Sequence, residues 1–315
     1  MTDTMRAVRI HDFGGTEVLR YAEDVPVPSP GPDDVLVRVH AAAVNRVDLD
    51  VRQGMWEFTH HPFPMTLGWD FAGTVESVGS ATTGLRVGDR VFGRPALTRD
   101  GTYAELLAVD PAEIAKAPES LPLEEAAALP LSALTAWKAL FEIGELTAGQ
   151  TVLILGGAGG VGTVAVQLAA HAGATVAATA SGTGIALARS LGADEVIDYR
   201  TGALAARGRF ADVVLDTIGG ATLEAAYASV VPGGRLITVA GTPDDARAAR
   251  EGIQAAGFIL EPDGPRLAEI AALVDAGSLR PVVHRTFDLG EAAQAHEFMA
   301  AGHMRGKLVL RVSPR

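Results

Sequence analysis

The sequence predicts an α/β protein that combines a doubly wound parallel sheet with a smaller antiparallel, β-rich part. From about residue 151 onward, short apolar runs alternate with alanine-rich segments of helical length, which is the pattern of parallel strands joined by crossover helices. The first third of the chain instead has strand-like runs between glycine- and proline-rich turns. That pattern favours a small, partly closed antiparallel barrel.

The β-rich part contains two clear strand candidates near its start, VLVRVHAA (35–42) and FAGTVESVG (71–79). Turn residues surround them, as in PSPGPDD (28–34). Mixed character returns near residue 280. There the sequence predicts a strand over 280–289, a helix over 291–302 that ends at a glycine, and a strand over 306–312.

The parallel sheet is expected to have six strands. The first, TVLILG (151–156), is apolar throughout, as a strand buried on both faces should be. The others are ATVAATA (174–180), EVIDY (195–199), DVVLDTI (212–218), RLITVA (235–240) and GFIL (257–260). The segment 121–140 has two prolines where helices can begin, and it is expected to bridge the two parts of the protein.

A glycine-rich turn follows the first parallel strand. Gly157, Gly159 and Gly162 fit the pattern G-x-G-x-x-G. Gly157 would permit a tight turn, Gly159 would let the backbone approach a pyrophosphate, and Gly162 would let the next helix pack closely on the sheet.

The helix that follows would begin at this turn, so the amides of Gly160 and Val161 would point at the phosphates of a bound nucleotide. A purely structural glycine turn is the alternative. The strand before the turn and the helix after it favour dinucleotide binding.

The end of the second parallel strand indicates which dinucleotide is bound. NAD sites usually place an acidic residue there, whereas no acid occurs between Gly157 and Asp194. The sequence therefore favours NADPH over NADH. Ser181, Thr183 and Tyr199 offer hydroxyl groups for the extra phosphate, although each could equally serve a turn or a strand end. No lysine or arginine stands between the glycines and Thr183 to clamp that phosphate.

Composition excludes several classes of function. The net charge of −12 disfavours nucleic-acid binding, and no basic segment would attract an anionic membrane. The chain has no cysteine, which excludes disulfides, thiolate zinc sites and cysteine nucleophiles. The N-terminal residues show no signal-peptide pattern and no long apolar stretch occurs, so a cytoplasmic location is expected.

Many stretches, in order, resemble the zinc-independent quinone oxidoreductase family of the medium-chain dehydrogenase/reductase superfamily. They are AAAVNRVDLDVRQG (41–54), PMTLGWDFAGTVESVG (64–79), GDRVFG (88–93), GTYAELLAV (101–109), AAALPLSALTAWKAL (126–140), GGAGGVGTVAVQLA (156–169), SLGADEVIDYR (190–200) and HMRGKLVLRV (303–312). The resemblance implies a Rossmann domain (123–270) inserted into a GroES-like antiparallel β-barrel domain (1–122 and 271–315). It also implies a homodimer.

The chain departs from the zinc-dependent relatives in this superfamily. Those relatives place a cysteine where Asn45 stands and a His-Glu pair where Trp69-Asp70 stands, so no zinc is expected here. His60 and His61 could be proposed as a metal pair. They are adjacent and precede a proline, so a surface loop is the preferred interpretation.

Without a metal, hydride transfer needs an acceptor that conjugation already polarises, which means a quinone or an α,β-unsaturated carbonyl compound. The resemblance therefore implies an NADPH-dependent reductase of such acceptors. Two alternatives remain open: an enoyl-thioester reductase of the polyketide or fatty-acid type, and a non-catalytic NADPH-binding protein.

The resemblance also implies site residues. Asn45 and Asp48 match the family's N-x-x-D motif. The Asn45 amide would donate to the substrate oxygen or orient the cofactor, with strand-end capping as the alternative, and Asp48 would support the loop. Trp56 would stack on a flat acceptor or form an apolar lid contact. It stands, with Asp50, where several relatives carry tyrosines, so an obvious phenolic proton donor is missing.

Four further residues are assigned to the cofactor by resemblance alone. Thr135 would lie beside the nicotinamide ribose, with packing inside a helix as the alternative. Ala240 and Gly241 would approach the nicotinamide through their backbone. Lys307 matches a Gly-Lys pair near the cofactor, although an ordinary solvated lysine is equally compatible with the sequence.

Overall fold

The structure, a computed structural model, describes residues 4–56, 62–302 and 304–312. Contacts divide the chain into two compact units. The β-rich unit comprises 1–131, 261–277 and 281–315, and the Rossmann unit comprises 132–260 and 278–280. The domain boundaries expected from the sequence, after residues 122 and 270, remain predictions.

The Rossmann unit contains a six-stranded sheet in which every neighbouring pair is parallel. Its strands are β9 (Thr151–Leu155), β10 (Thr175–Ala180), β11 (Glu195–Asp198), β12 (Ala211–Asp216), β13 (Val230–Thr238) and β14 (Gln254–Gly257). The spatial order is β11-β10-β9-β12-β13-β14. This is the doubly wound order 3-2-1-4-5-6 of dinucleotide-binding sheets, so the predicted parallel sheet is confirmed.

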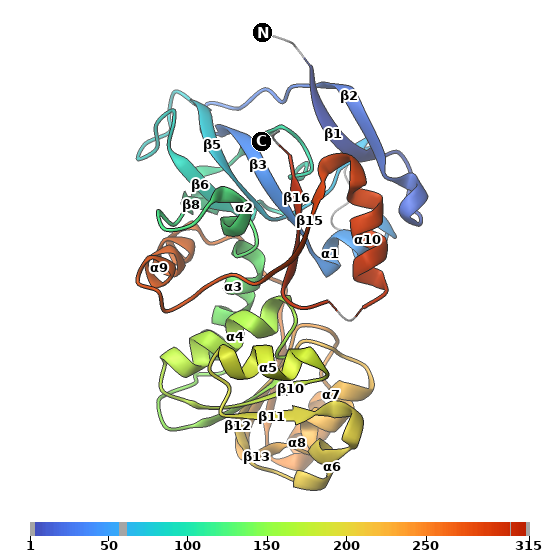
Figure 1. The fold of residues 1–315 in the computed structure, drawn as a ribbon, viewed down its shortest axis with the longest axis vertical. Coiled ribbons are helices and arrows are strands. Elements are labelled where there is room, and N and C mark those ends of the chain that lie inside the picture. The colour runs from blue at the N-terminus through green and yellow to red at the C-terminus, as the bar shows by residue number, and fades with distance from the viewer. Residues whose placement is uncertain (1–3, 57–61, 303, 313–315) are drawn as a thin grey trace. The chain divides into compact units, whose positions relative to one another are not determined.

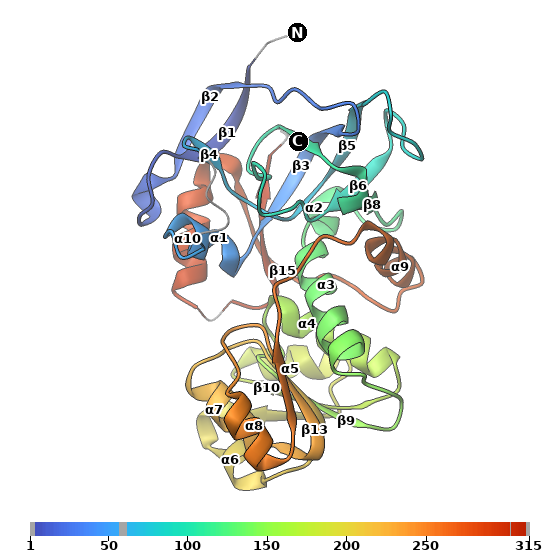
Figure 2. The same cartoon turned by 180° about the vertical axis from the view of Figure 1, so that it is seen from behind.

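Helices cover both faces of this sheet. Figures 1 and 2 show α4 (Gly160–His171) and α5 (Thr183–Ser190) on one face, with α7 (Ala221–Tyr227) and α8 (Asp245–Glu251) on the other. The short helix α6 (Ala203–Arg207) connects β11 to β12. Covering helices explain why β9 is apolar along its length: four of its five residues are fully buried.

The sixth strand lies earlier than the sequence indicated. The apolar run 257–260 suggested a strand there, but β14 ends at Gly257 and pairs Gln254 with Arg235. Ile259 lies beyond the strand and is exposed. The prediction of a strand over 257–260 was therefore wrong. The actual edge strand has small and polar side chains and is only partly buried, so it lacks the apolar run by which a buried strand is recognised.

The bridging segment forms helices where its prolines predicted them. Pro122 precedes α2 (Leu123–Ala126), and Pro130 is the first residue of α3 (Pro130–Trp137). A π-helical stretch, Lys138–Ile143, continues α3. Proline suits a helix start because its fixed φ is helical and its missing N–H would have had no intrahelical acceptor.

The β-rich unit contains two sheets. The smaller has the order β2-β1-β4, and the larger has the order β15-β16-β3-β5-β6-β8, with β7 also paired to β3. The strands are β1 (Thr4–Ile10), β2 (Arg20–Pro26), β3 (Val35–Val44), β4 (Met65–Thr66), β5 (Phe71–Val78), β6 (Arg90–Gly93), β7 (Leu106–Val109), β8 (Ile114–Lys116), β15 (Val283–Asp288) and β16 (Lys307–Arg311). The helices α1 (Arg46–Arg52), α9 (Gly264–Asp275) and α10 (Ala292–Ala300) belong to this unit, as does α2.

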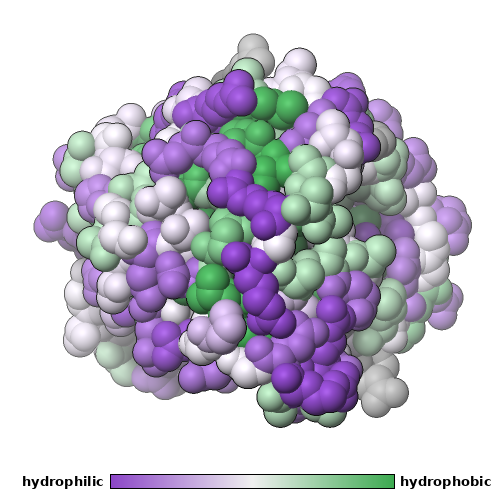
Figure 3. Space-filling model, turned by 90° about the horizontal axis from the view of Figure 1, so that it is seen from below, coloured by the Kyte–Doolittle hydropathy of each residue, from purple (hydrophilic) through white to green (hydrophobic). Residues whose placement is uncertain are grey.

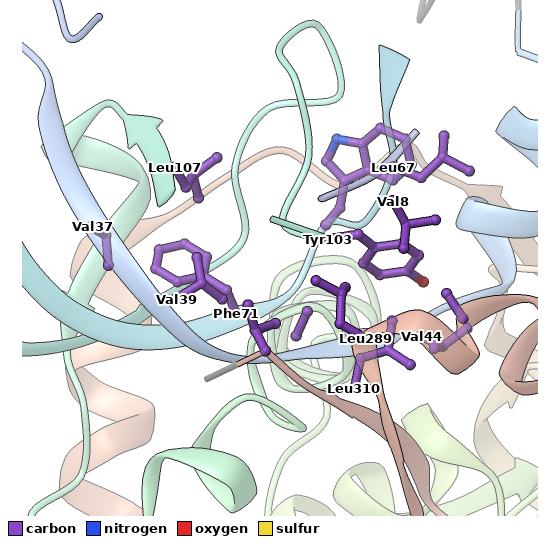
Figure 4. Close-up of a cluster of buried hydrophobic side chains, with 14 of the residues drawn as sticks. Val8, Val37, Val39, Val44, Leu67, Phe71, Tyr103, Leu107, Leu289 and Leu310 are labelled. Carbon is purple, nitrogen blue, oxygen red and sulfur yellow. The ribbon is translucent and has the colours of Figure 1, made fainter. Parts of the chain in front are cut away.

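The core of the β-rich unit joins segments from both ends of the chain. Figure 4 shows side chains from β1, β3, β5 and β7 in one cluster with Leu289 and with Leu310 of β16. Leu310 is fully buried. Truncating a buried leucine to alanine typically lowers the free energy of unfolding by about 2–5 kcal/mol. The strand predicted over 306–312 is therefore part of the core of this unit.

The exposed surface carries scattered apolar groups. The face in Figure 3 mixes hydrophilic and apolar side chains. Among described residues, the most exposed large apolar side chains include Met55, Val87 and Ile218. None of the described helices is both long enough and apolar enough to cross a membrane.

Candidate active site and cofactor site

The glycine-rich turn after β9 is tied to the neighbouring strand. Gly156 N donates to Thr179 Oγ1 (3.0 Å), and Gly157 N donates to the Thr179 carbonyl (2.9 Å). The left-handed residue that makes the turn is Gly156 (φ +82°) and not Gly157 as the motif suggested. At Gly157 a Cβ would instead lie 2.7 Å from the Ala178 Cβ, so this glycine is needed for packing between strands.

The other two motif glycines have different surroundings. A Cβ on Gly162 would lie 2.0 Å from the Gly156 oxygen, so glycine is required where α4 crosses β9. A Cβ on Gly159 would meet only the Gly156 oxygen, at 3.3 Å. The fold alone gives little reason for glycine at position 159. The space that it leaves open suits a ligand that approaches the backbone, as predicted for a pyrophosphate.

Helix α4 begins directly at this turn. Thr163 is the first residue whose amide has an intrahelical acceptor, the Gly159 carbonyl at 2.9 Å. The amides of Gly160, Val161 and Gly162 precede it and lie at the positive end of the helix dipole. Three such amides beside an open backbone are suited to bind phosphate oxygens.

The predicted hydroxyl groups at the end of β10 lie partly together. Ser181 Oγ donates to Tyr199 Oη at 2.9 Å, although 18 residues separate them. Thr183 is the exposed first residue of α5. Sequence reasoning missed Arg200, which follows Tyr199 and pairs with Asp198 at 2.6 Å. That pair lowers the pKa of Asp198 to about 2. Arg200 is thus a cation next to Tyr199 in the sequence, and its guanidinium bonds the Asp198 carboxylate through Nε and Nη2.

The remaining cofactor candidates in the Rossmann unit differ in exposure. Ala240 and Gly241 are exposed and follow the carboxyl end of β13. Thr135 is buried inside α3, which agrees with the packing alternative. The glycine turn, Ser181, Tyr199 and Ala240 all follow carboxyl ends of parallel strands, the edge where doubly wound sheets bind nucleotides.

In the β-rich unit, strand register brings a second polar group together. Val44 of β3 pairs with Leu308 of β16, so the next positions, Asn45 and Lys307, are opposite each other. The Ala43 amide bonds the Asp70 carbonyl (3.1 Å), which places Asp70 beside them at the start of β5. These residues are at one end of the larger sheet.

The three side chains form a closed set of contacts, the Lys307–Asp70–Asn45 cluster. Lys307 Nζ donates to Asp70 Oδ2 at 2.9 Å and also to Asn45 Oδ1. Asn45 Nδ2 donates to Asp70 Oδ2 at 3.0 Å, and the Leu131 amide donates to Asp70 Oδ1 at 2.6 Å. Burial raises the pKa of Asp70, and the Lys307 charge opposes that rise.

This geometry corrects two expectations. Lys307 is only 4% exposed, so it is not an ordinary solvated lysine. The Asn45 amide donates to Asp70 and to the Ala43 carbonyl (3.3 Å), so both of its hydrogens already have acceptors. An ammonium group carries three hydrogens, and Lys307 uses two of them in the cluster. The available donor is therefore Lys307.

Asp48 anchors a chain of buried hydrogen bonds that runs away from Asn45. Its Oδ2 accepts from the Asn45 amide (2.8 Å) and from Tyr103 Oη (2.7 Å). Tyr103 Oη also bonds His296 Nε2 (3.1 Å), and His296 Nδ1 bonds Arg52 Nη1 (3.2 Å). All five residues are at most 4% exposed. Asp48 thus bonds the backbone at Asn45, directly before α1.

Donor chemistry fixes the direction of this chain. Arginine only donates, so His296 Nδ1 must accept and its proton must lie on Nε2. Tyr103 then accepts from His296 and donates to Asp48. Burial, with Arg52 nearby, lowers the pKa of His296 to about 3. Burial also raises the pKa of Asp48 to about 7, and its enclosed Oδ1 has no hydrogen-bond partner in the part of the chain that the structure describes.

Sequence reasoning missed Asp70, Tyr103, His296 and Arg52. Asp70 could have been found, because it stands where zinc-dependent relatives carry a glutamate. Nothing in the sequence links Tyr103 to His296, which is 193 positions away. Their contact follows only from the fold.

Three candidate residues, Trp56, His60 and His61, follow α1. Trp56 is half-buried against the core of the β-rich unit, which agrees with the apolar-contact alternative. His60 and His61 lie outside the described residues. Within the described ranges, no three histidine, aspartate or glutamate side chains lie close enough together to hold a metal ion.

Known proteins match almost the whole chain. Residues 31–119 match the family described as alcohol dehydrogenase GroES-like domain, and residues 191–310 match that described as zinc-binding dehydrogenase. A mitochondrial NAD(P)H oxidoreductase from Mus musculus is 34% identical over 98% of this chain and 89% of its own length. A chloroplastic NADPH-dependent alkenal/one oxidoreductase from Arabidopsis thaliana is 36% identical over 98% and 80%.

The protein belongs to the quinone oxidoreductase family of the medium-chain dehydrogenase/reductase superfamily. Solved structures agree with this assignment. The quinone oxidoreductase from Coxiella burnetii superimposes with a TM-score of 0.92 at 33% identity, over 98% of this chain and all of that one. A mycobacterial structure complexed with NADPH gives 0.86 at 29% identity, over 98% and 100%. The GroES-like domain and the parallel Rossmann sheet predicted from the sequence are thus confirmed.

Part of one larger relative is also similar. A polyketide synthase from Streptomyces halstedii is 37% identical over 89% of this chain, which covers 5% of that protein. This chain is therefore also similar to a short segment of a much longer protein.

Proposed function

We propose that this quinone oxidoreductase family member uses NADPH to reduce quinones or α,β-unsaturated carbonyl compounds without a metal ion. The observation that carries the proposal is the buried Lys307–Asp70–Asn45 cluster. It holds the Lys307 ammonium against Asn45 and Asp70, two positions matched to the metal-site residues of the zinc-dependent relatives. NADPH would supply the hydride.

Lys307 would act on the acceptor's oxygen. Hydride addition to a conjugated carbonyl places negative charge on that oxygen, and a donor already held in position stabilises it. Asp70 and Asn45 fix the Lys307 ammonium, so its third hydrogen has a defined direction. Asp48 and the Tyr103–His296–Arg52 chain fix Asn45 in turn. In this proposal Lys307 is the catalytic residue and Asn45 is a positioning residue.

The cofactor would bind the Rossmann unit, with its pyrophosphate at Gly159 and the α4 amides. No acid stands at the end of β10, and the Ser181–Tyr199 pair with neighbouring Arg200 suits a phosphate on the ribose. These features support NADPH over NADH. The contacts of Thr135, Ala240, Gly241 and Lys307 with the cofactor, and the stacking of Trp56 on an acceptor, stay predictions.

One experiment tests the main proposal. Consumption of NADPH and of NADH is followed by absorbance with benzoquinone, an enone and an enoyl thioester. We expect NADPH to be preferred, and the quinone or enone to be reduced. Tight NADPH binding without oxidation by any acceptor would instead identify a non-catalytic binding protein.

Enoyl-thioester reduction is the second candidate, because a polyketide synthase segment matches most of this chain. It would be preferred if the thioester were reduced with a kcat/KM at least about tenfold above that for the free enone.

Lys307→Met separates the two roles open to this residue. If Lys307 is an oxyanion donor, the substitution should lower kcat with little change in NADPH affinity. If it is a cofactor ligand, the substitution should raise the dissociation constant for NADPH.

The expected homodimer and cytoplasmic location also stay predictions. Sedimentation and cell fractionation would test them.

A further inference from the structure

Arg94 lies beside the polar cluster, at the same end of the larger sheet. Phe71 of β5 pairs with Gly93 of β6, so the next positions in this antiparallel pair are Asp70 and Arg94. Gly93 also pairs with Ile114 of β8, which places Arg94 next to Glu113. The register therefore puts an arginine one strand away from Asp70.

The Arg94 side chain is buried, and no described residue bonds to it. The residue is 3% exposed, its Nε is fully enclosed, and none of its nitrogens donates to a group among the described residues. Burial lowers the pKa of Arg94 to about 10, so the group remains charged near neutral pH. A buried guanidinium without an acceptor is costly unless a ligand supplies one.

The neighbouring carboxylates stabilise the charge without bonding to it. Asp70 has the largest effect, followed by Glu113, Asp48 and Glu261. Both Asp70 oxygens are already taken by Lys307, Asn45 and the Leu131 amide. Arg94 is thus held as a cation near the cluster while its own donors stay available.

Two other arginines of this unit show what a partnered group looks like. Arg52 is equally buried and bonds His296 and the Gly14 carbonyl. Arg99, in the same loop as Arg94, makes a two-pronged contact with Asp34 at 2.8 and 2.9 Å. The loop therefore allows an arginine to be bonded, as Arg99 is, and among the described residues Arg94 is not bonded.

We infer that Arg94 binds a carboxylate of the acceptor, so that the natural acceptor is a conjugated carbonyl compound that also carries an acid group. A planar guanidinium matches a carboxylate with two parallel hydrogen bonds. Lys307 Nζ bonds Asp70 at 2.9 Å, and the register places Arg94 opposite Asp70, one strand spacing or about 5 Å along the sheet. The reacting carbonyl and the acid group would then lie a few bonds apart. This inference rests on the proposed function.

The test compares acetylacrylate, a conjugated keto acid, with its neutral methyl ester. We expect wild-type kcat/KM to be roughly 10- to 100-fold higher for the acid, the usual effect of a charged hydrogen bond. Arg94→Met should lower kcat/KM for the acid far more than for the ester, so that the ratio falls toward one. Arg94→Lys should keep part of it. Arg99→Met, which removes a partnered arginine from the same loop, should keep all of it.

Other outcomes would overturn the inference. An equal loss for acid and ester in Arg94→Met would mean that the residue serves the fold or the reacting oxygen. A higher dissociation constant for NADPH in that variant, with the ratio unchanged, would mean that the anion belongs to the cofactor. Equal wild-type rates for acid and ester would exclude a carboxylate site.

A binding measurement separates this inference from the proposed function. Levulinate, the saturated analogue of acetylacrylate, lacks the conjugated C=C bond that would accept hydride, and calorimetry without NADPH measures its binding without turnover. If no acceptor is reduced but Arg94→Met weakens levulinate binding, the proposed function fails and the carboxylate site remains. If the wild-type protein reduces enones but does not bind levulinate, the carboxylate site is refuted and the proposed function still holds.

Discussion

Lys307 and Asp70 form an ion pair 2.9 Å long in which the side chains are 5% and 0% exposed. The two residues are 237 positions apart in the chain. Removing one partner at such a site leaves an uncompensated buried charge, and this costs far more stability than the loss of an ion pair at the surface.

Lys307→Met should therefore lower the free energy of unfolding by about 3–5 kcal/mol. The matched control is Lys116→Met, which breaks an exposed pair with Asp89 and should cost less than about 1 kcal/mol. Urea unfolding near neutral pH measures both variants. Equal, small losses would show that Asp70 carries no charge in the folded protein.

Two glycine substitutions should separate folding from cofactor binding. Gly162→Ala forces a Cβ against the Gly156 oxygen and should destabilise the protein by more than about 2 kcal/mol. Gly159→Ala meets only one atom at 3.3 Å, so thermal unfolding should change little. Its dissociation constant for NADPH should nevertheless rise at least about tenfold. Unchanged affinity in Gly159→Ala would contradict the phosphate position proposed here.

Asp48 should make stability fall as the pH rises. Its folded pKa, about 7, lies above the unfolded value of about 3.9, so the folded state holds its proton more tightly. Its contribution is complete below about pH 4 and is lost as the pH rises through 7. Asp48→Asn lacks this loss. The variant should thus gain stability relative to wild type between pH 5 and 8, and parallel curves would refute the prediction.

His296 should stay neutral over a wide pH range. Its folded pKa of about 3 lies below the unfolded value of about 6.5, so its contribution to stability is present above pH 6.5 and is lost as the pH falls toward 3. Nitrogen NMR of the ring should show the proton on Nε2 near neutral pH and no titration above about pH 4. Titration near 6.5, or a proton on Nδ1, would exclude the hydrogen-bond chain to Asp48.

Ser181→Asp should shift the cofactor preference toward NADH. A carboxylate at the end of β10 can bind the ribose hydroxyls of NADH, and it repels the extra phosphate of NADPH. The ratio of kcat/KM values, NADPH over NADH, should fall at least about tenfold. Ser190→Asp, at the far end of α5, adds the same charge away from the strand and should leave the ratio within about twofold. Equal effects would implicate net charge alone.

The sequence predicted what short-range patterns determine. Apolar runs predicted β9 and β12, and the glycine spacing predicted the start of α4. Burial and local backbone geometry each require particular residue types at neighbouring positions, so both can be recognised in the sequence. The edge strand β14 was misplaced because a partly buried strand of small residues has no such trace.

The polar clusters were beyond the reach of the sequence. Asn45 was singled out, but its partner Lys307 comes from a strand more than 260 residues later. A lysine that is buried and one that is solvated look alike in a sequence. Strand register decides between them, and register is set by the whole sheet.

The place of β16 in the larger sheet has a consequence for biosynthesis. This strand lies between β3 and β15 and also delivers Lys307. On the ribosome, the segments with Asn45 and Asp70 emerge long before residues 307–311 are made. Until then the nascent chain holds an acidic group without its counter-charge and a sheet with a missing strand. Pairing of β16 with β3 therefore completes the larger sheet and the Lys307–Asp70–Asn45 cluster in the same step.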